Sequence, residues 1–231
     1  MKLLATDYDG TLYTDKTNLM LNMEAINKFM SNGNKFAIIT GRCFTSIKKE
    51  IKNYNIKYDY LACNNGLIVF DNKDNIVASS VLASKDLQKI YRKLNTNPEI
   101  RKIKFFNFYE DTSELNNILE MYVKFKDSTC ARKYKRFFES NMPNIKCYNI
   151  SNKLFIGNKK TKADAVSIIQ QIHNIDNGNI YTVGDNLNDL EMLEKYNGHK
   201  MIYSYPSLWF KKIPVTREVH TLVKKINKKH W

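Results

Sequence analysis

The sequence of 231 residues has little cysteine, proline and glycine, with four, four and eight residues respectively. Its cysteines form no C-x-x-C pair, which argues against a zinc ribbon, a thioredoxin-type site and a secreted disulfide framework. No apolar run approaches the ~18–20 residues that cross a bilayer, and the N-terminal run 1–6 is too short for a signal-peptide core. The sequence has four histidines, His173, His199, His220 and His230, and they show no metal-ligand spacing. These absences predict a cytoplasmic globular protein without structural zinc.

Positive charge is abundant, since 37 lysines and arginines outnumber 23 aspartates and glutamates and give a net charge of +14. A basic excess attracts phosphate in any form, nucleic acid included. The lysines are spread along the whole chain, with clusters only at 48–52, 132–136 and 224–229. A basic nucleic-acid-binding protein therefore remains an alternative function rather than the main expectation.

The hydrophobic pattern changes in the middle of the chain. Near both ends, short apolar runs alternate with helical periodicity, which predicts a parallel sheet covered on both faces. The runs that we expect to be strands are 2–6, 36–39, 58–62, 180–183 and 200–203, and the expected helices are 21–31, 45–53, 162–172, 189–195 and 217–227. The middle favours an antiparallel α+β insert, with helices at 86–94 and 129–140 and extended segments at 75–82, 103–109, 120–125 and 146–150. We thus expect a core formed by 1–70 and 152–231, with an inserted domain at 71–151.

Two acidic side chains follow the first expected strand directly, in Asp7-Tyr8-Asp9-Gly10-Thr11. In an open parallel sheet, functional groups lie beyond the carboxyl ends of the strands. Two carboxylates this close repel each other unless a cation is present, and an oxygen-only site suits Mg²⁺. The alternative is an acidic surface turn.

Two further segments carry groups that suit a phosphate. Thr40-Gly41-Arg42 ends the second strand with a hydroxyl and bare backbone N–H groups, although an ordinary turn has the same composition. Lys162, at the start of an expected helix, could neutralise a phosphoryl group. A surface lysine is the alternative there. Lys159 and Lys160 are close enough in sequence that either could take this role instead of Lys162.

A second acidic loop, Gly184-Asp185-Asn186-Leu187-Asn188-Asp189, follows the strand 180–183. Asp185 is a candidate metal ligand, and Asp189 is a candidate for capping the next helix or supporting the site. Helix capping alone would also explain this composition. A functional site is favoured because the chain contains four such loops, each placed after a strand or at a helix start.

Taken in order, D-Y-D-G-T, I-T-G-R, K-A-D-A-V and G-D-N-L-N-D resemble the four motifs of the haloacid dehalogenase superfamily. The pattern is similar to the Cof-type sugar-phosphatase branch, whose N-G element matches Asn64-Asn65-Gly66. The resemblance implies an α/β fold: a Rossmann-like, doubly wound parallel-sheet core with an inserted α+β cap of the C2B type.

The resemblance also implies a mechanism, that of a Mg²⁺-dependent phosphatase acting on a small phosphorylated metabolite such as a sugar phosphate. Asp7 would be the nucleophile that forms an aspartyl-phosphate, and Asp9 the general acid and base. Mg²⁺ would be bound by the Asp7 carboxylate, the Asp9 backbone carbonyl and Asp185. The expected phosphate-binding residues are Tyr8, Thr40, Gly41, Lys162 and Asn188; Asp189, Gly10 and Thr11 would support the site, and Arg42 and Asn65 are possible substrate contacts.

Some features separate this chain from the pattern or leave choices open. Many Cof-type proteins have M-G-N-A where this chain has Met201-Ile202-Tyr203-Ser204, and the late N-x-x-G-V element is replaced by residues 216–220. Phosphomutase-type transfer to a second substrate is an alternative to hydrolysis. In the insert, aromatic and basic residues either read the leaving group or simply pack its core: Phe105, Phe108, Tyr109 and Lys124. The sequence names neither the substrate nor the oligomeric state.

Overall fold

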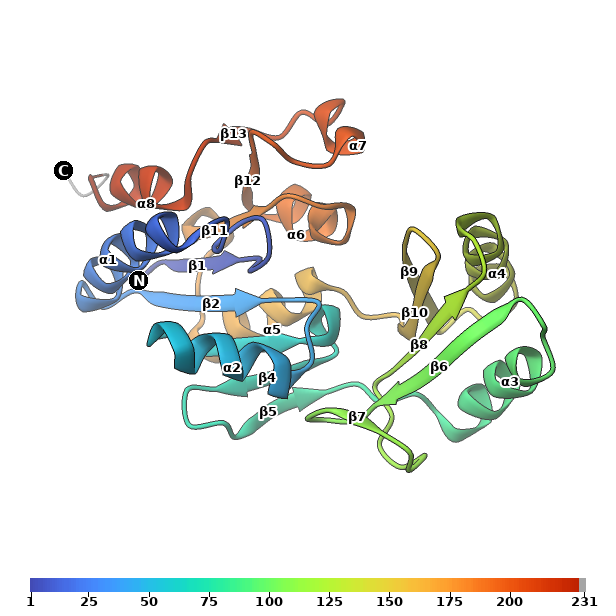
Figure 1. Ribbon diagram of the computed structural model, residues 1–231. Coiled ribbons are helices and arrows are strands. Elements are labelled where there is room, and N and C mark those ends of the chain that lie inside the picture. The colour runs from blue at the N-terminus through green and yellow to red at the C-terminus, as the bar shows by residue number, and fades with distance from the viewer. Residues whose placement is uncertain (229–231) are drawn as a thin grey trace. The chain divides into compact units, whose positions relative to one another are not determined.

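The structure is a computed structural model that describes residues 1–228; Lys229 of the basic cluster 224–229 and His230 lie outside the described residues. It divides into two units. Unit 1 contains residues 1–41, 48–78 and the chain from Thr161 onward, and unit 2 contains 42–47 and 79–160. Each unit has its own sheet and its own helices (Figure 1). Within residues 1–228, no helix has the length and apolar character that crossing a bilayer requires.

Unit 1 is built on an eight-stranded sheet in the order β13-β12-β11-β1-β2-β3-β4-β5. All pairs from β13 to β3 are parallel, and β4 runs antiparallel to β3. The strands are β1 (Leu3–Thr6), β2 (Lys35–Ile39), β3 (Tyr60–Cys63), β4 (Ile68–Asp71), β5 (Ile76–Ser79), β11 (Ile180–Gly184), β12 (Asn197–Met201) and β13 (Val215–Thr216). This confirms the predicted α/β core with a mainly parallel sheet.

Helices cover both faces of this sheet, because the central strands are apolar on both sides. All four residues of β1 are buried, as are the last four of β2. On one face, α5 and α6 pack against alternate strand residues such as Leu3, Ala5 and Ala37. Elsewhere α1 and α8 lie side by side (Figure 1). The helices of the unit are α1 (Lys16–Ser31), α2 (Phe44–Tyr54) from residue 48 onward, α5 (Lys162–His173), α6 (Leu190–Lys195), α7 (Pro206–Trp209) and α8 (Val219–Lys228), with the short 3₁₀ turns η1 (Asn64–Gly66), η2 (Asn177–Asn179) and η3 (Leu187–Asp189).

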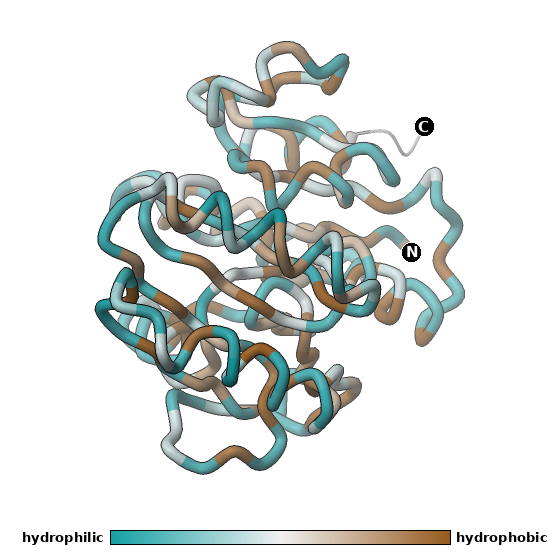
Figure 2. Tube along the Cα trace, turned by 90° about the vertical axis from the view of Figure 1, so that its right-hand side faces the viewer, coloured by the Kyte–Doolittle hydropathy of each residue, from teal (hydrophilic) through white to brown (hydrophobic). Residues whose placement is uncertain are grey.

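Unit 2 has a five-stranded antiparallel sheet in the order β7-β6-β8-β10-β9. Its strands are β6 (Ile100–Phe106), β7 (Asp111–Thr112), β8 (Glu120–Phe125), β9 (Ile145–Ile150) and β10 (Lys153–Asn158), and its helices are α3 (Ser84–Asn95) and α4 (Ser128–Asn141). The two helices and the sheet enclose a separate hydrophobic core. Along the trace of Figure 2, hydrophobic and hydrophilic stretches alternate, as amphipathic elements require. This is the α+β layout predicted for the insert.

The boundaries differ from the sequence-based expectation of 71–151 for the insert. The segment 71–78 belongs to unit 1, because β5 continues the large sheet next to β4. At the other end, β10 pairs with β8 and β9, so residues 153–158 belong to the small sheet. One strand is also shifted: the strand predicted at 200–203 is present as β12, but it ends at Met201, so Ile202 and Tyr203 lie beyond it.

Candidate active site

A buried lysine joins the acidic loops that follow β1 and β11. Lys162 is 1% exposed, and its Nζ lies 2.6 Å from Asp7 Oδ1 and 2.6 Å from Asp189 Oδ1. Asp7 follows β1 directly, and Asp189 ends the loop after β11. These loops meet because β1 and β11 are neighbouring parallel strands, with Thr6 opposite Val183, so both chains leave the sheet at the same edge.

The start of α5 fixes which lysine enters the site. Thr161 caps the helix: its Oγ1 accepts a hydrogen bond from the backbone N–H of Ala163, and the Asp164 carboxylate accepts one from the Thr161 N–H. A Cβ on Gly66, whose φ is +91°, would lie 2.3 Å from the Thr161 carbonyl oxygen, so only glycine allows the turn η1 to pack this closely. Lys162 is buried as a result, whereas Lys159 and Lys160 are exposed.

The Asp185 carboxylate is held beside the first acidic loop. Its Oδ1 accepts a hydrogen bond of 2.9 Å from the Thr11 hydroxyl. A Cβ on Gly10, which has a φ of +76°, would lie 2.8 Å from Asp185 Oδ2, so a glycine is needed at this approach. Gly10 and Thr11 therefore support the site by placing Asp185.

Asp189 shapes the second loop with both of its oxygens. Oδ2 accepts hydrogen bonds from the backbone N–H groups of Asp185 (3.1 Å) and Asn186 (3.0 Å), while Oδ1 pairs with Lys162. A Cβ on Gly184 would collide with this side chain, at 2.5 Å from Asp189 Cβ. Asp189 thus orients both the loop that carries Asp185 and the ammonium that faces Asp7.

The cluster has more negative than positive charge. Ligand oxygens of Asp7, Asp185 and Asp189 all lie within 4.8 Å of one another, and Lys162 is the cation paired with two of these carboxylates. Burial raises the pKa of Asp7 well above its ordinary value although Lys162 opposes this, and burial together with Asp189 raises the pKa of Asp185. Burial lowers the pKa of Lys162, but the two carboxylates outweigh burial and keep it above its ordinary value.

These shifts mean that the ionised carboxylates lack sufficient positive charge around them. Oxygen donors with uncompensated negative charge are what a hard divalent cation such as Mg²⁺ binds. The residues therefore fit the expected metal. Asp7 and Asp185 are the candidate ligand carboxylates, since both oxygens of Asp189 already have partners in the protein. The carboxylate of Asp9 is exposed and is not part of the cluster.

Asn65 contacts or closely approaches three of the expected phosphate-binding residues: Thr40, Gly41 and Asn188. Its side-chain Oδ1 accepts a hydrogen bond of 2.9 Å from Asn188 Nδ2, and its backbone N–H donates to the Thr40 carbonyl at 3.0 Å. A Cβ on Gly41 would lie only 3.1 Å from Asn65 Oδ1. Asn65 is 5% exposed and has a φ of +58°, a left-handed conformation that asparagine tolerates better than most residues. Sequence reasoning missed this link between the second and fourth motifs.

Two predicted contacts, Tyr8 and Arg42, are not among the residues that the interactions described above bring together. The Tyr8 side chain is fully buried and stacks on Tyr13 with ring centroids 5.8 Å apart, so its backbone is the part that remains for a phosphate. Arg42 is half-buried and groups with unit 2. In unit 2, Phe105 packs against the hydrophobic core, as the packing alternative expected, and Lys124 is exposed.

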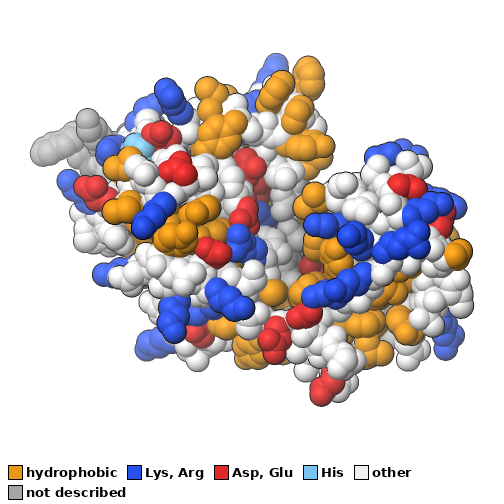
Figure 3. Space-filling view, in the orientation of Figure 1, with side chains coloured by type: hydrophobic (Ala, Val, Ile, Leu, Met, Phe, Trp, Pro, Cys, Tyr) orange, Lys and Arg blue, Asp and Glu red, His pale blue; other side chains and the backbone are white. Residues whose placement is uncertain are grey.

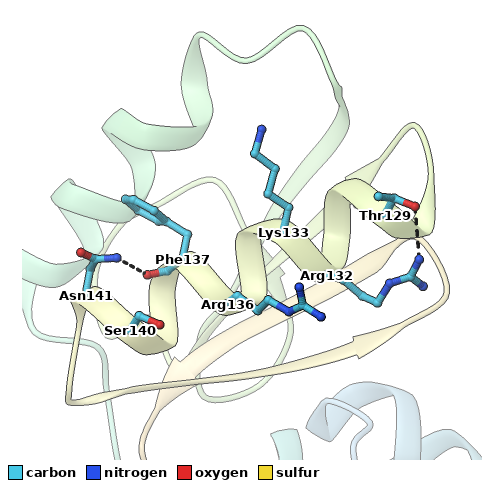
Figure 4. A pocket seen from close by; sticks show the side chains of 7 residues that line it. All are labelled: Thr129, Arg132, Lys133, Arg136, Phe137, Ser140 and Asn141. Carbon is cyan, nitrogen blue, oxygen red and sulfur yellow. Dashed lines mark hydrogen bonds between the residues drawn. The ribbon is translucent and has the colours of Figure 1, made fainter.

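A hollow on α4 of unit 2 offers no comparable chemistry. Its volume is about 460 Å³, and it is lined by Thr129, Arg132, Lys133, Arg136, Phe137, Ser140 and Asn141. Figure 4 shows Lys133 and Arg136 pointing in different directions from the helix, so their charges do not converge on one point. The lining includes no carboxylate.

Comparison with known proteins gives consistent matches. The family model described as haloacid dehalogenase-like hydrolase matches residues 4–112 and 101–201. An uncharacterised protein of Mycoplasma capricolum subsp. capricolum is 28% identical over 234 residues, which cover 84% of this chain and 88% of that protein.

Solved structures share the fold over nearly the whole chain. A haloacid dehalogenase-like hydrolase from B. subtilis superposes with a TM-score of 0.84 at 16% identity, covering 97% of this chain and 99% of that one. A sugar phosphatase of subclass IIB of the superfamily gives a TM-score of 0.80 at 15% identity, covering 98% and 99%. At these identities the likeness establishes the fold alone, including an α+β unit of the predicted cap type.

Proposed function

The chain belongs to the haloacid dehalogenase-like hydrolases, and we propose that it is a Mg²⁺-dependent phosphatase for a small phosphorylated metabolite. The observation that supports this most is the buried Lys162 ammonium, 2.6 Å from both Asp7 and Asp189 and next to the Asp185 loop. Phosphoryl transfer depends mainly on positioning and charge neutralisation. A nucleophilic carboxylate beside a fixed cation provides both.

Hydrolysis would proceed in two steps. An Asp7 carboxylate oxygen attacks phosphorus, and the ester P–O bond breaks as the leaving oxygen takes a proton from the Asp9 carboxyl group. Water then attacks the aspartyl-phosphate, Asp9 takes the water proton, and the bond between phosphorus and Asp7 breaks. The exposure of the Asp9 side chain suits this role, because it must reach both the leaving group and water.

The remaining groups hold the phosphoryl oxygens and the metal. Lys162, the Thr40 hydroxyl, the Gly41 N–H and the Asn188 amide are the proposed phosphate contacts. Asp7 and Asp185, with the Asp9 backbone carbonyl implied by the family resemblance, would bind Mg²⁺. When bound, the ion would supply charge neutralisation at the phosphoryl oxygens.

Asn65 would act through Asn188 rather than on the substrate. The hydrogen bond of 2.9 Å fixes the Asn188 amide, and the side chain of Asn65 is almost fully buried. Asn65→Gly removes the acceptor and tolerates the positive φ. We expect this variant to raise the KM for a phosphate monoester and the inhibition constant of inorganic phosphate, while the melting temperature stays close to that of the wild type.

Known structures suggest a substrate class. The similar proteins include a sugar phosphatase, and a sugar phosphate or related metabolite is the proposed substrate type. Transfer of the phosphoryl group to a second substrate is distinguished by products: a phosphomutase isomerises a hexose phosphate without releasing free phosphate.

The direct test measures phosphate release from p-nitrophenyl phosphate with and without Mg²⁺. Asp7→Asn should remove essentially all activity, because no nucleophile remains. Asp9→Asn should slow turnover by ~10²–10⁴, the usual contribution of a general acid or base. A matched control is Asp176→Asn, since Asp176 is exposed and makes no capping hydrogen bond. Turnover at the wild-type rate in the Asp7 variant would reject the proposal.

The same variants test the nucleic-acid-binding alternative. Lysine and arginine side chains are spread over the visible surface of both units (Figure 3). If the basic surface binds RNA or DNA as its main function, affinity should fall steeply with salt and be unchanged in Asp7→Asn. Absence of phosphatase activity together with that result would favour the binding function.

A further inference from the structure

The segment 202–210, which we call the aromatic segment, exposes large apolar side chains. Phe210 is 89% exposed and Trp209 60%, and three further side chains of the segment are at least half exposed: Ile202 (58%), Tyr203 (50%) and Tyr205 (55%). Figure 3 shows hydrophobic side chains gathered over α7, which lies in this segment. Single exposed apolar residues are ordinary, but a contiguous group on a globular surface marks a contact site.

This exposure is not the result of a loosely held loop. Leu208 is fully buried and anchors α7 in a small hydrophobic cluster. The Trp209 indole N–H donates a hydrogen bond of 2.8 Å to the Ser204 carbonyl. The buried Lys200 ammonium donates to the carbonyls of Leu208 and Lys211, at 2.8 Å each. A fixed backbone that presents aromatic rings loses little conformational entropy when it binds a ligand.

The aromatic segment adjoins the candidate metal site within unit 1. The backbone N–H of Tyr205 donates a hydrogen bond of 2.7 Å to the carbonyl oxygen of Asp185. Leu187, in the same loop as Asp185, is 48% exposed. The backbone of the aromatic segment therefore adjoins the loop that carries Asp185.

This is also a place where the chain departs from the Cof-type pattern. Where many of those proteins have M-G-N-A, this chain has Met201-Ile202-Tyr203-Ser204, followed by Tyr205. Ile202 and Tyr203 thus place bulky side chains directly after β12. The difference is a property of this chain, and the catalytic groups described above do not use it.

We propose that the aromatic segment is a stacking surface for the leaving group, and that the substrate is a phosphate monoester whose leaving group carries a planar aromatic ring, as in a nucleoside monophosphate. The inference rests on the proposed phosphatase function. Rings stack on tyrosine, tryptophan and phenylalanine faces in offset or edge-to-face geometry. The phosphate would bind at Lys162 and Asp7 while the ring covers exposed aromatic surface. A stable protein partner covers ~20–30 residues on each side, far more than this segment offers.

The test uses two substrates that differ only in the base. Ribose 5-phosphate and adenosine 5′-monophosphate share the sugar and the phosphate. In the wild type with Mg²⁺, kcat/KM should be roughly 5–140-fold higher for the nucleotide, the range expected from stacking of one base. Phe210→Ala and Tyr205→Ala should lower the nucleotide value toward that of ribose 5-phosphate and leave the latter unchanged. Met20→Ala, at a 64% exposed apolar residue in α1, is the matched control.

Several results would overturn the inference. One is equal kcat/KM for the two substrates in the wild type, and another is an equal loss on both in the variants. A dimer in light scattering that Phe210→Ala converts to a monomer would assign the surface to a second copy of the chain. If the wild type hydrolyses neither substrate nor p-nitrophenyl phosphate, the proposed function fails. Calorimetric titration of both ligands into wild type and variants then decides the inference, because stacking predicts tighter nucleotide binding that the two variants lose.

Discussion

Replacing Lys162 with methionine leaves the carboxylates of Asp7 and Asp189 facing each other without their common partner. The side chains are 1%, 9% and 0% exposed for Lys162, Asp7 and Asp189, so water cannot take over the role of the ammonium without rearrangement. Methionine has similar length and no charge. The variant therefore isolates the electrostatic contribution of the lysine from its packing.

Removing one partner of a buried ion pair costs ~3–5 kcal/mol, because the other charge stays buried. Asp189 keeps two backbone N–H donors on Oδ2, so most of this energetic cost arises from the unpaired carboxylate of Asp7. For a chain of 231 residues, this corresponds to a fall in melting temperature of roughly 6–20 °C in the absence of divalent cations. Because the variant site carries more uncompensated negative charge, added Mg²⁺ should raise its melting temperature more than that of the wild type.

The pH dependence has a definite sign. Burial raises the pKa of Asp7 in the folded protein, and Lys162 opposes this, so its loss raises that pKa further. A carboxyl group whose folded pKa exceeds its unfolded value of about 3.9 binds protons more tightly when folded, and its contribution to stability is lost as the pH rises through the folded pKa. The loss of stability caused by Lys162→Met should therefore be largest at neutral pH. It should shrink as the pH falls toward the pKa of an aspartate in the unfolded chain.

Thermal unfolding followed by circular dichroism, in EDTA and in Mg²⁺, measures these effects. Lys159→Met is the control, since Lys159 is an exposed lysine three positions away. Asp189→Asn in the Lys162→Met background should recover part of the loss, because one orphaned charge disappears while an oxygen acceptor remains. Equal melting temperatures for the Lys162 and Lys159 variants would refute the assignment of Lys162 as the buried bridge.

Three further predictions concern packing, thiols and the metal. Gly66→Ala should destabilise the protein by about 1–3 kcal/mol in urea unfolding, because its Cβ would lie 2.3 Å from the Thr161 carbonyl oxygen at a φ of +91°. Gly178→Ala is the control and should be near neutral, since a Cβ there meets nothing within 4 Å. A thiol reagent at pH 8 should label half-buried Cys43 in the native protein and spare Cys147, because burial raises the pKa of Cys147 to about 12; rapid labelling of Cys147 would contradict its burial. Mg²⁺ at 100 times its dissociation constant should stabilise the wild type by ~2.7 kcal/mol, and Asp185→Asn should lose most of this shift; an unchanged shift in that variant would argue against Asp185 as a ligand.

Much of the site could be predicted from local sequence. Asp7, Thr40 and Asp185 each follow a short apolar strand, and parallel strands place such residues at one edge of the sheet. The pairing of β1 with both β2 and β11 brings those strand ends together. The alternation of apolar strands and helices likewise predicted the core fold and an α+β insert, because burial on both faces of a sheet demands that pattern.

Other features depended on contacts between distant segments. The sequence left Lys159, Lys160 and Lys162 as alternatives, and only the close packing of Gly66 on Thr161 decides which of them is buried. The hydrogen bond between Asn65 and Asn188 joins residues 123 positions apart, and no local pattern signals it.

By itself, the sequence determined which strands are buried and which polar residues follow them, because hydrophobic periodicity and turn chemistry act over a few residues. Only the tertiary structure decided which of those residues meet, which aromatic rings are buried, as in Tyr8, and which stay in solvent, as in Phe210. The physical reason is that burial and pairing depend on the whole set of packed neighbours, most of which come from remote parts of the chain.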